Sequence, residues 1–134
     1  MEYRDLYPAL VTIVALLVYL WNAMQCGGAR AKHGVIAPAT TGHPDFERKL
    51  RIQQNMLEQL MLFIPSLWIF SLTIQVLVGA ALGALFIIGR IIYSLSYARD
   101  PAKRGLGFGL GILPVLILLV GSLIGVVRLL LIVN

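Results

Sequence analysis

The sequence predicts an all-α integral membrane protein, a bundle of four transmembrane helices formed as one domain over residues 1–134. Hydrophobic residues make up 59% of the chain and charged residues only 13%, whereas about a quarter of the residues in soluble domains are charged. The charges are also clustered, so that residues 6–29, 59–89 and 105–127 carry none. Since a helix needs roughly 20 apolar residues to cross the hydrocarbon core, these stretches leave room for four spans.

The uncharged stretches divide into spans as follows. The first and last are each about one span long and predict helices over residues 6–26 and 107–130. The middle stretch is too long for one span, and Gly79 and Gly83 near its centre indicate a tight reversal that separates spans over 52–76 and 80–98. Cys26 is the only cysteine, so no intrachain disulfide can form, and the acidic start of the chain favours a retained first helix over a signal peptide.

Loop composition predicts where the helices begin and end. Residues 27–44 are rich in glycine and proline and predict a loop. Thr41–Asp45 offers capping side chains and Pro44 suits a first helical turn, so the second helix should begin there, several turns before its apolar part. Asp100-Pro101 should end the third helix, because proline disfavours helix in the residue before it. The glycines at 105–111 follow no strand, so they predict close helix packing and not a nucleotide-binding loop.

Lysine and arginine concentrate at two of the predicted connections, between the first and second spans and between the third and fourth. The positive-inside rule places both connections in the cytoplasm and both termini opposite, and the short loops favour a bacterial inner membrane over the endoplasmic reticulum. The net charge of +5 is thus a one-sided basic surface, which suits an anionic lipid or small molecule and lacks the interleaved aromatics of a nucleic-acid binder. The basic residues at these connections are Arg30, Lys32, Arg48, Lys49, Arg51, Arg90, Arg99, Lys103 and Arg104.

One face of the second helix carries a cation, an amide and a carboxylate. Arg51, Asn55 and Glu58 are four and three residues apart, which places them within about 60° of arc on a helix. Glu58 lies past the border of the apolar segment, where a carboxylate is costly unless it is paired. Two alternatives follow: Glu58 forms a salt bridge with Arg51 or Arg90, or it receives the ammonium group of a ligand.

The third helix carries a second polar stripe, Arg90, Tyr93 and Tyr97, at the same level of the membrane. The tyrosines alone are equally typical of an interfacial belt. Several cations, two phenols and an amide around a single acid nevertheless exceed what one salt bridge needs. This excess favours a cavity for a small ligand that bears carboxylates and an ammonium group.

Two motifs resemble those of the MAPEG family, the membrane-associated proteins in eicosanoid and glutathione metabolism. The stretch TGHPDFERKLRIQQNMLE (41–58) is similar to the family signature E-R-x-x-R-x-x-x-N-x-x-E, and GRIIYSLSYARDPAKR (89–104) resembles its third-helix segment. The resemblance covers roughly residues 29–106. It implies a homotrimer of four-helix subunits with glutathione, the co-substrate, bound between neighbours near the cytoplasmic face.

The resemblance also implies roles for particular residues. Glu58 would receive the γ-glutamyl ammonium group of glutathione. Arg104 would lie against the sulfur and favour its thiolate, which would attack a lipophilic electrophile or a lipid hydroperoxide arriving from the bilayer. The chain would then be a membrane-bound glutathione transferase with an associated peroxidase activity. The remaining glutathione-binding positions are Arg51, Asn55 and Tyr93 at the γ-glutamyl carboxylate, Arg30 and Gln53 from the adjoining subunit at the glycine carboxylate, and Tyr97 in the pocket wall.

Departures from the family pattern narrow this expectation. Ala31 stands where the leukotriene C synthase branch has an arginine and Gln59 where it has a tyrosine, which favours a general detoxifying transferase over leukotriene synthesis. His33 and His43 lie too far from other ligands in sequence to argue for a metal site. Two rival functions remain: a non-catalytic, lipid-presenting member of the family, and a small multidrug exporter with one membrane carboxylate.

Overall fold

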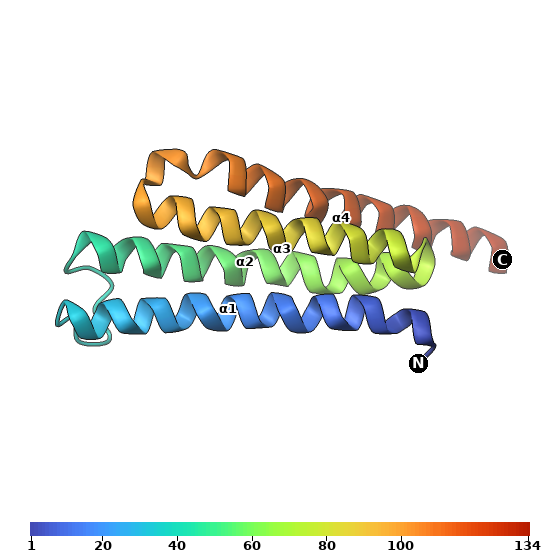
Figure 1. Ribbon diagram of the computed structural model, residues 1–134. Coiled ribbons are helices and arrows are strands. Elements are labelled where there is room, and N and C mark those ends of the chain that lie inside the picture. The colour runs from blue at the N-terminus through green and yellow to red at the C-terminus, as the bar shows by residue number, and fades with distance from the viewer.

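The computed structural model describes residues 1–134 as four long helices without a strand, which confirms the predicted all-α fold. All four helices are long and apolar enough to cross a membrane. Figure 1 shows them lying along one another in a bundle. In chain order the elements are η1 (Tyr3–Asp5), α1 (Leu6–Lys32), α2 (Pro44–Thr73), α3 (Val76–Arg99), η2 (Pro101–Lys103) and α4 (Gly105–Val133), where η marks a 3-10 turn.

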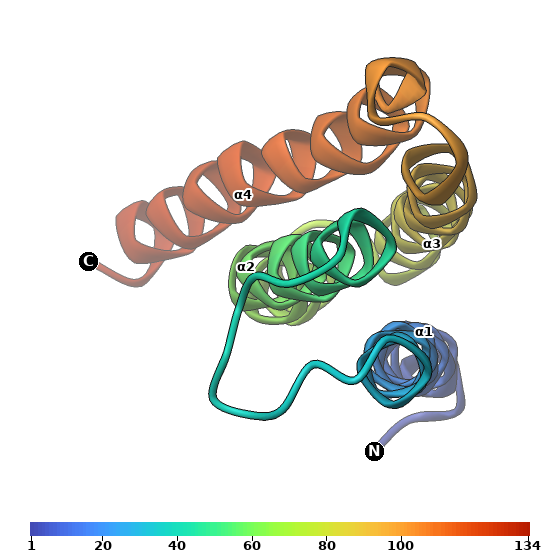
Figure 2. The ribbon, with the colours of Figure 1, turned by 90° about the vertical axis from the view of Figure 1, so that its left-hand side faces the viewer.

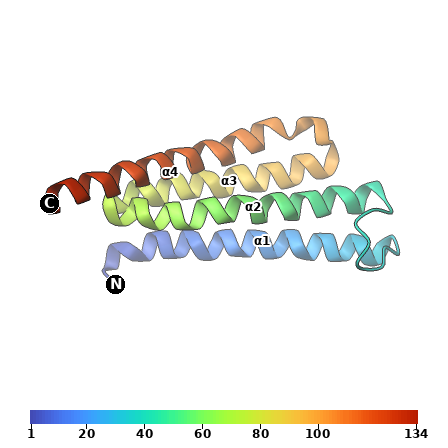
Figure 3. The same ribbon diagram turned by 180° about the vertical axis from the view of Figure 1, so that it is seen from behind.

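The helices run up and down, so that the two basic connections meet at one end of the bundle and both termini lie at the other (Figures 1 and 3). We call the end with the connections the basic end. Viewed along the bundle in Figure 2, α2 and α3 lie between α1 and α4. Both outer helices pack on both central ones. The central pair therefore supplies the faces on which an enclosed site can form.

Side chains at the helix ends explain where α2 begins and α3 ends. The ring of His43 accepts a hydrogen bond from the backbone N–H of Asp45 at 3.1 Å, and Pro44 occupies the first turn, as its fixed φ favours. Asp100 follows α3 in an extended conformation and accepts a hydrogen bond from the backbone N–H of Ala102. Both predicted boundaries are confirmed, whereas the predicted loop over 27–44 begins too early, because α1 continues through Gly27 and Gly28 to Lys32.

The reversal between the second and third helices lies earlier than predicted. The break falls at Ile74–Gln75, and the Gln75 side chain caps α3 by accepting from the backbone N–H of Val78 at 2.7 Å. Gly79 and Gly83, which the sequence suggested as the turn, lie inside α3 and are buried. A Cβ on Gly79 would approach Ser71 Oγ to 2.5 Å, so the absence of a side chain there permits helix contact.

The bundle core is apolar and draws on all four helices. Phe63 of α2 stacks on Phe86 of α3, with ring centroids 3.9 Å apart. Association of helices in lipid depends on such packing, because the surrounding acyl chains are as apolar as the core. The fully apolar cluster contains Ala15, Val18, Met56, Leu60, Phe63, Leu67, Phe70, Phe86, Ile87, Val115 and Leu118.

Candidate functional site

A polar pocket of about 450 Å³ opens near the basic end, between α2, α3 and the start of α4. It joins two arginines, an asparagine and two tyrosines that the sequence analysis singled out on separate helices. A cavity of similar size between α2 and α4 has an almost wholly apolar lining. Of these two cavities, only the first is lined by charged and polar side chains. Its lining residues are Arg51, Asn55, Tyr93, Tyr97, Arg104 and Phe108.

The α2 wall of the pocket contains its own ion pair. Arg51 Nη1 lies 3.3 Å from Glu58 Oε1, seven residues further along the same helix. Both side chains are about half exposed, at 47% and 58%, so the pair is held weakly and can separate. Of the two salt-bridge partners considered for Glu58, the structure selects Arg51 and not Arg90.

The α3 wall is aromatic. The rings of Tyr93 and Tyr97 stack with centroids 5.5 Å apart, as their four-residue spacing allows. Phe108 of α4 packs beside Tyr93, with ring centroids 6.5 Å apart, and it completes an apolar side of the pocket. The sequence analysis missed Phe108. Its position four residues after Arg104, on the same helix face, was the available signal.

Arg90 lies behind this wall, inside the bundle. Its side chain is only 1% exposed, and its Nη1 donates to Asn55 Oδ1 at 2.7 Å. Its Cζ lies 4.2 Å from the centre of the Tyr93 ring, in a cation–π contact. One buried cation thus contacts pocket residues of both α2 and α3.

Glycines at the start of α4 bring that helix against α3. A Cβ on Gly107 would lie 2.5 Å from the Cα of Tyr93, and one on Gly89 would lie 2.5 Å from the backbone N of Gly111. The prediction that the glycines at 105–111 serve helix packing is confirmed for Gly107 and Gly111, but it is wrong for Gly105 and Gly109, where an added Cβ would meet nothing within 4 Å. The close contact at Gly107 holds the start of α4 against α3. Arg104 and Phe108 line the pocket there, and Arg104 Nη1 donates to the carbonyl of Pro101 at 3.1 Å.

Three of the predicted binding residues do not line the pocket of this chain: Glu58 lies beside it, paired with Arg51, and two others face elsewhere. Arg30, at the end of α1, donates to the carbonyl of Ala39 at 2.8 Å and lies 4.5 Å above the Phe46 ring. Gln53 faces α1, with Nε2 3.5 Å from the Tyr19 hydroxyl. One chain therefore brings together five of the predicted residues, with Glu58 beside them, but not these two.

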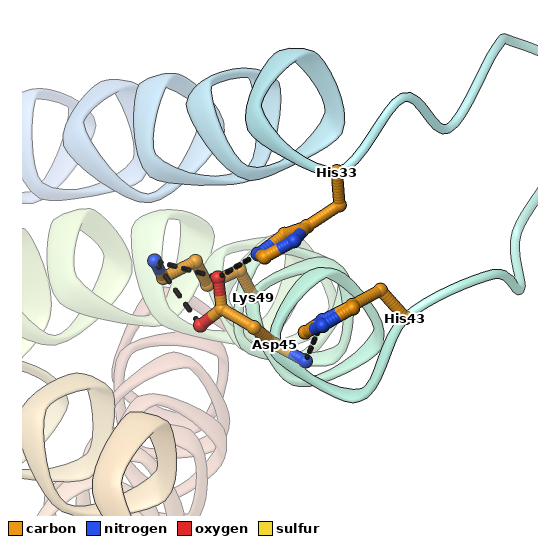
Figure 4. Close-up of polar contacts among 4 residues, drawn as sticks. All are labelled: His33, His43, Asp45 and Lys49. Carbon is orange, nitrogen blue, oxygen red and sulfur yellow. Dashed lines mark hydrogen bonds and ion pairs between the residues drawn. The ribbon is translucent and has the colours of Figure 1, made fainter.

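The two loop histidines, which the sequence analysis left without a role, lie face to face. His33 ends α1 and His43 caps α2, and their rings stack with centroids 3.5 Å apart (Figure 4). His33 Nε2 lies 2.9 Å from Asp45 Oδ2, and Lys49 Nζ lies 3.3 Å from the other carboxylate oxygen. These contacts close the long loop onto the bundle and fix the start of the helix that carries Arg51.

Fold and site together define a helical membrane protein with a pocket lined by arginine and tyrosine side chains. The model of the MAPEG family matches residues 8–124, which is most of the sequence. The chain belongs to the MAPEG family, and the predicted membership is confirmed.

Relatives with assigned names align over most of the chain. The chain is 40% identical to microsomal glutathione S-transferase 2 of Homo sapiens over 113 residues, which cover 83% of this chain and 77% of that protein. It is 34% identical to leukotriene C4 synthase of Cavia porcellus over 96 residues, or 72% of this chain and 64% of that protein. An uncharacterized protein of Synechocystis is 48% identical over 121 residues, 90% of this chain and 88% of its own length.

Proposed function

We propose that this chain is a membrane-bound glutathione transferase that joins glutathione to lipophilic electrophiles. The observation that carries the proposal is the pocket at the basic end, in which Arg51, Asn55, Tyr93 and Arg104 come together from three helices beside Glu58. The names of the relatives, a glutathione S-transferase and leukotriene C4 synthase, support the same ligand. A small multidrug exporter would not need arginines gathered around its carboxylate.

Each end of glutathione has a complementary group in this arrangement. Glu58 separates from Arg51 and receives the γ-glutamyl ammonium group. Arg51 then holds the adjacent carboxylate together with the amide of Asn55 and the hydroxyl of Tyr93, through charge-assisted hydrogen bonds. Tyr97 covers the pocket wall. The pocket's position, between helices and open at the basic end, suits a polar ligand that enters from the cytoplasm.

The glycine carboxylate of glutathione requires residues from a second copy of the chain. Arg30 and Gln53 point away from the pocket of their own chain, toward the α1–α2 loop and Tyr19. We therefore assign them to the neighbouring pocket in a homotrimer. This assembly would also cover the half-exposed Arg51 and Glu58, which strengthens their contacts with a ligand by removing water.

Arg104 is the group that activates the sulfur. A thiol with a pKa of about 8.5 is only a few per cent thiolate near pH 7. An arginine about 4 Å from the sulfur stabilises the thiolate by roughly 4 kcal/mol at an effective dielectric near 20. Solvent screens part of this at an exposed residue, but half of it, about 1.5 pKa units, would make thiolate as abundant as thiol.

The reaction is a nucleophilic attack. The thiol proton leaves to solvent, the thiolate forms a carbon–sulfur bond, and the leaving group of the electrophile departs with its electron pair. With a lipid hydroperoxide, the thiolate attacks the terminal oxygen and the O–O bond breaks. An alcohol and glutathione sulfenic acid form, and a second glutathione converts the sulfenic acid to disulfide and water. The acceptor reaches the sulfur from the bilayer, past the Phe108 side of the pocket.

Ultraviolet difference absorbance of the purified protein with glutathione tests this proposal. We expect a saturable thiolate band in the wild type, a residual band in Arg104→Lys, and none in Arg104→Ala. Conjugation of chlorodinitrobenzene should decline in the same order. A wild type that neither binds glutathione at millimolar concentration nor forms the band contradicts the proposal and favours the lipid-presenting alternative.

A further inference from the structure

Arg90 is the largest side chain that the bundle buries completely. Its Nη1 has one partner, Asn55 Oδ1, while its Nε and Nη2 have none. The acid of the facing helix, Glu58, pairs with Arg51 instead. A buried guanidinium without a carboxylate is costly, and ionisable groups inside membrane bundles generally mark functional sites. The function proposed above gives Arg90 no role.

Three helices fix the position of this guanidinium. Arg90 and the Tyr93 ring beneath it belong to α3, and Asn55 belongs to α2. On α4, a Cβ at Gly111 would lie 3.2 Å from Arg90 Cδ, so the glycine leaves space for the arginine stem. Arg90 does not line the pocket, and packing prevents it from turning toward a ligand.

The contact with Arg90 determines how the Asn55 amide is oriented. The oxygen and nitrogen of an amide have nearly the same shape, but arginine has only donors, so the oxygen must face Arg90. The Asn55 nitrogen, Nδ2, then makes no hydrogen bond within the protein, and Asn55 lines the pocket. At this point the pocket presents N–H groups and not a carbonyl.

We propose that Arg90 is a positioning residue that makes Asn55 a hydrogen-bond donor to the ligand. By holding Oδ1, it directs the Asn55 amide N–H groups to a ligand oxygen that carries negative charge. The inference rests on the proposed function for the identity of that oxygen, the γ-glutamyl carboxylate of glutathione. Arg90 acts only through Asn55, and it selects a carboxylate over groups that need an acceptor.

The test compares two ligands on each variant. They are glutathione and its analogue in which the γ-glutamyl carboxylate is a primary carboxamide, titrated calorimetrically into the purified full-length protein. The wild type should prefer glutathione by about 10-fold or more, the loss expected when a charge-assisted hydrogen bond is removed.

Asn55→Asp keeps an oxygen facing Arg90 but presents a second oxygen to the ligand. Its affinity for glutathione should fall roughly 100-fold because like charges meet, and its preference should shift to the carboxamide.

Thermal stability separates this role from a merely structural one. Asn55→Asp should unfold at no lower a temperature than the wild type, since it gives Arg90 a charged partner. Asn55→Ala should unfold at a lower temperature because it leaves Arg90 unpaired. Arg90→Met should reduce the preference for glutathione over the carboxamide several-fold, since the Asn55 amide can then turn over, while Arg51 and Tyr93 retain the rest of the preference.

The possible results are distinguishable. Loss of stability with an unchanged ligand preference in Arg90→Met, or an unchanged preference in Asn55→Asp, overturns the inference while the proposed function stands. A wild type that binds neither ligand overturns the proposed function and the ligand-selecting role together. The stability order of the two Asn55 variants then still decides whether Arg90 depends on Asn55 for its partner.

Discussion

Replacing Gly107 by alanine should separate α4 from α3 and open the pocket. The added Cβ would lie 2.5 Å from the Cα of Tyr93, whereas ordinary contact begins near 3.4 Å. The obstructing atoms belong to the backbone and cannot rotate away, so the helices must move apart by about 0.9 Å. Overpacking of this kind typically costs about 1–3 kcal/mol. Arg104, which directly precedes α4, and Phe108, which lies in its first turn, would be displaced together with the helix.

Gly109 provides a matched control two residues along the same helix. A Cβ there has no neighbour within 4 Å, so Gly109→Ala should be neutral or stabilising by up to about 1 kcal/mol through helix propensity. Thermal unfolding in detergent and glutathione titration measure both effects. We expect Gly107→Ala to unfold at a lower temperature than Gly109→Ala and to bind glutathione more weakly. Equal stability and equal affinity of the two variants would refute the packing argument.

Three further predictions concern single side chains. Glu58→Gln should weaken glutathione binding by roughly 10-fold or more, since a charged hydrogen bond to the ligand's ammonium group is lost. Thermal stability should stay nearly unchanged, because the ion pair of Glu58 with Arg51 is exposed. Unchanged glutathione affinity in calorimetry would reject the ammonium contact. Phe108→Ala should raise the KM for an apolar electrophile more than it raises the Kd for glutathione. Phe108→Leu should change both constants little. If Phe108→Ala raised KM and Kd by the same factor, Phe108 would lie outside the acceptor path. Asp45→Asn should lower the free energy of unfolding by about 1 kcal/mol, because it removes the charged contact with His33 and a negative charge from the first turn of α2, without loss of glutathione affinity. An unaltered melting temperature would exclude that role.

Local chemistry made several helix ends predictable from the sequence. A proline restricts both its own backbone and that of the residue before it, so Pro44 and Asp100-Pro101 marked boundaries without tertiary information. The turn at Ile74–Gln75 was missed for the opposite reason. Glycine signals either a turn or close helix contact, and only the packing of Gly79 against its neighbours decides between these.

Helical spacing predicted much of the pocket but not the pairing within it. Residues three or four apart share a face, which placed Arg51 with Asn55 and Tyr93 with Tyr97. Which arginine contacts Glu58 depends on the rotation of α3 about its axis, which sequence spacing leaves open. The structure turns Arg90 inward to Asn55 and leaves Arg51 to the acid. The stacked histidines likewise required the path of the loop, which composition does not specify.

The ion pair between Arg51 and Glu58 has a consequence for what the pocket excludes. In the proposed binding mode, Arg51 and Glu58 each contact a charged group of the ligand, and their ion pair supplies each with an opposite charge before the ligand binds. A simple anion such as chloride or a lipid phosphate that displaced Glu58 would leave the carboxylate without a cation. An amino acid head group is a zwitterion and satisfies both partners at once, so the exchange conserves charge. Under the proposed function, a molecule that reproduces both halves of the pair therefore competes best for the pocket.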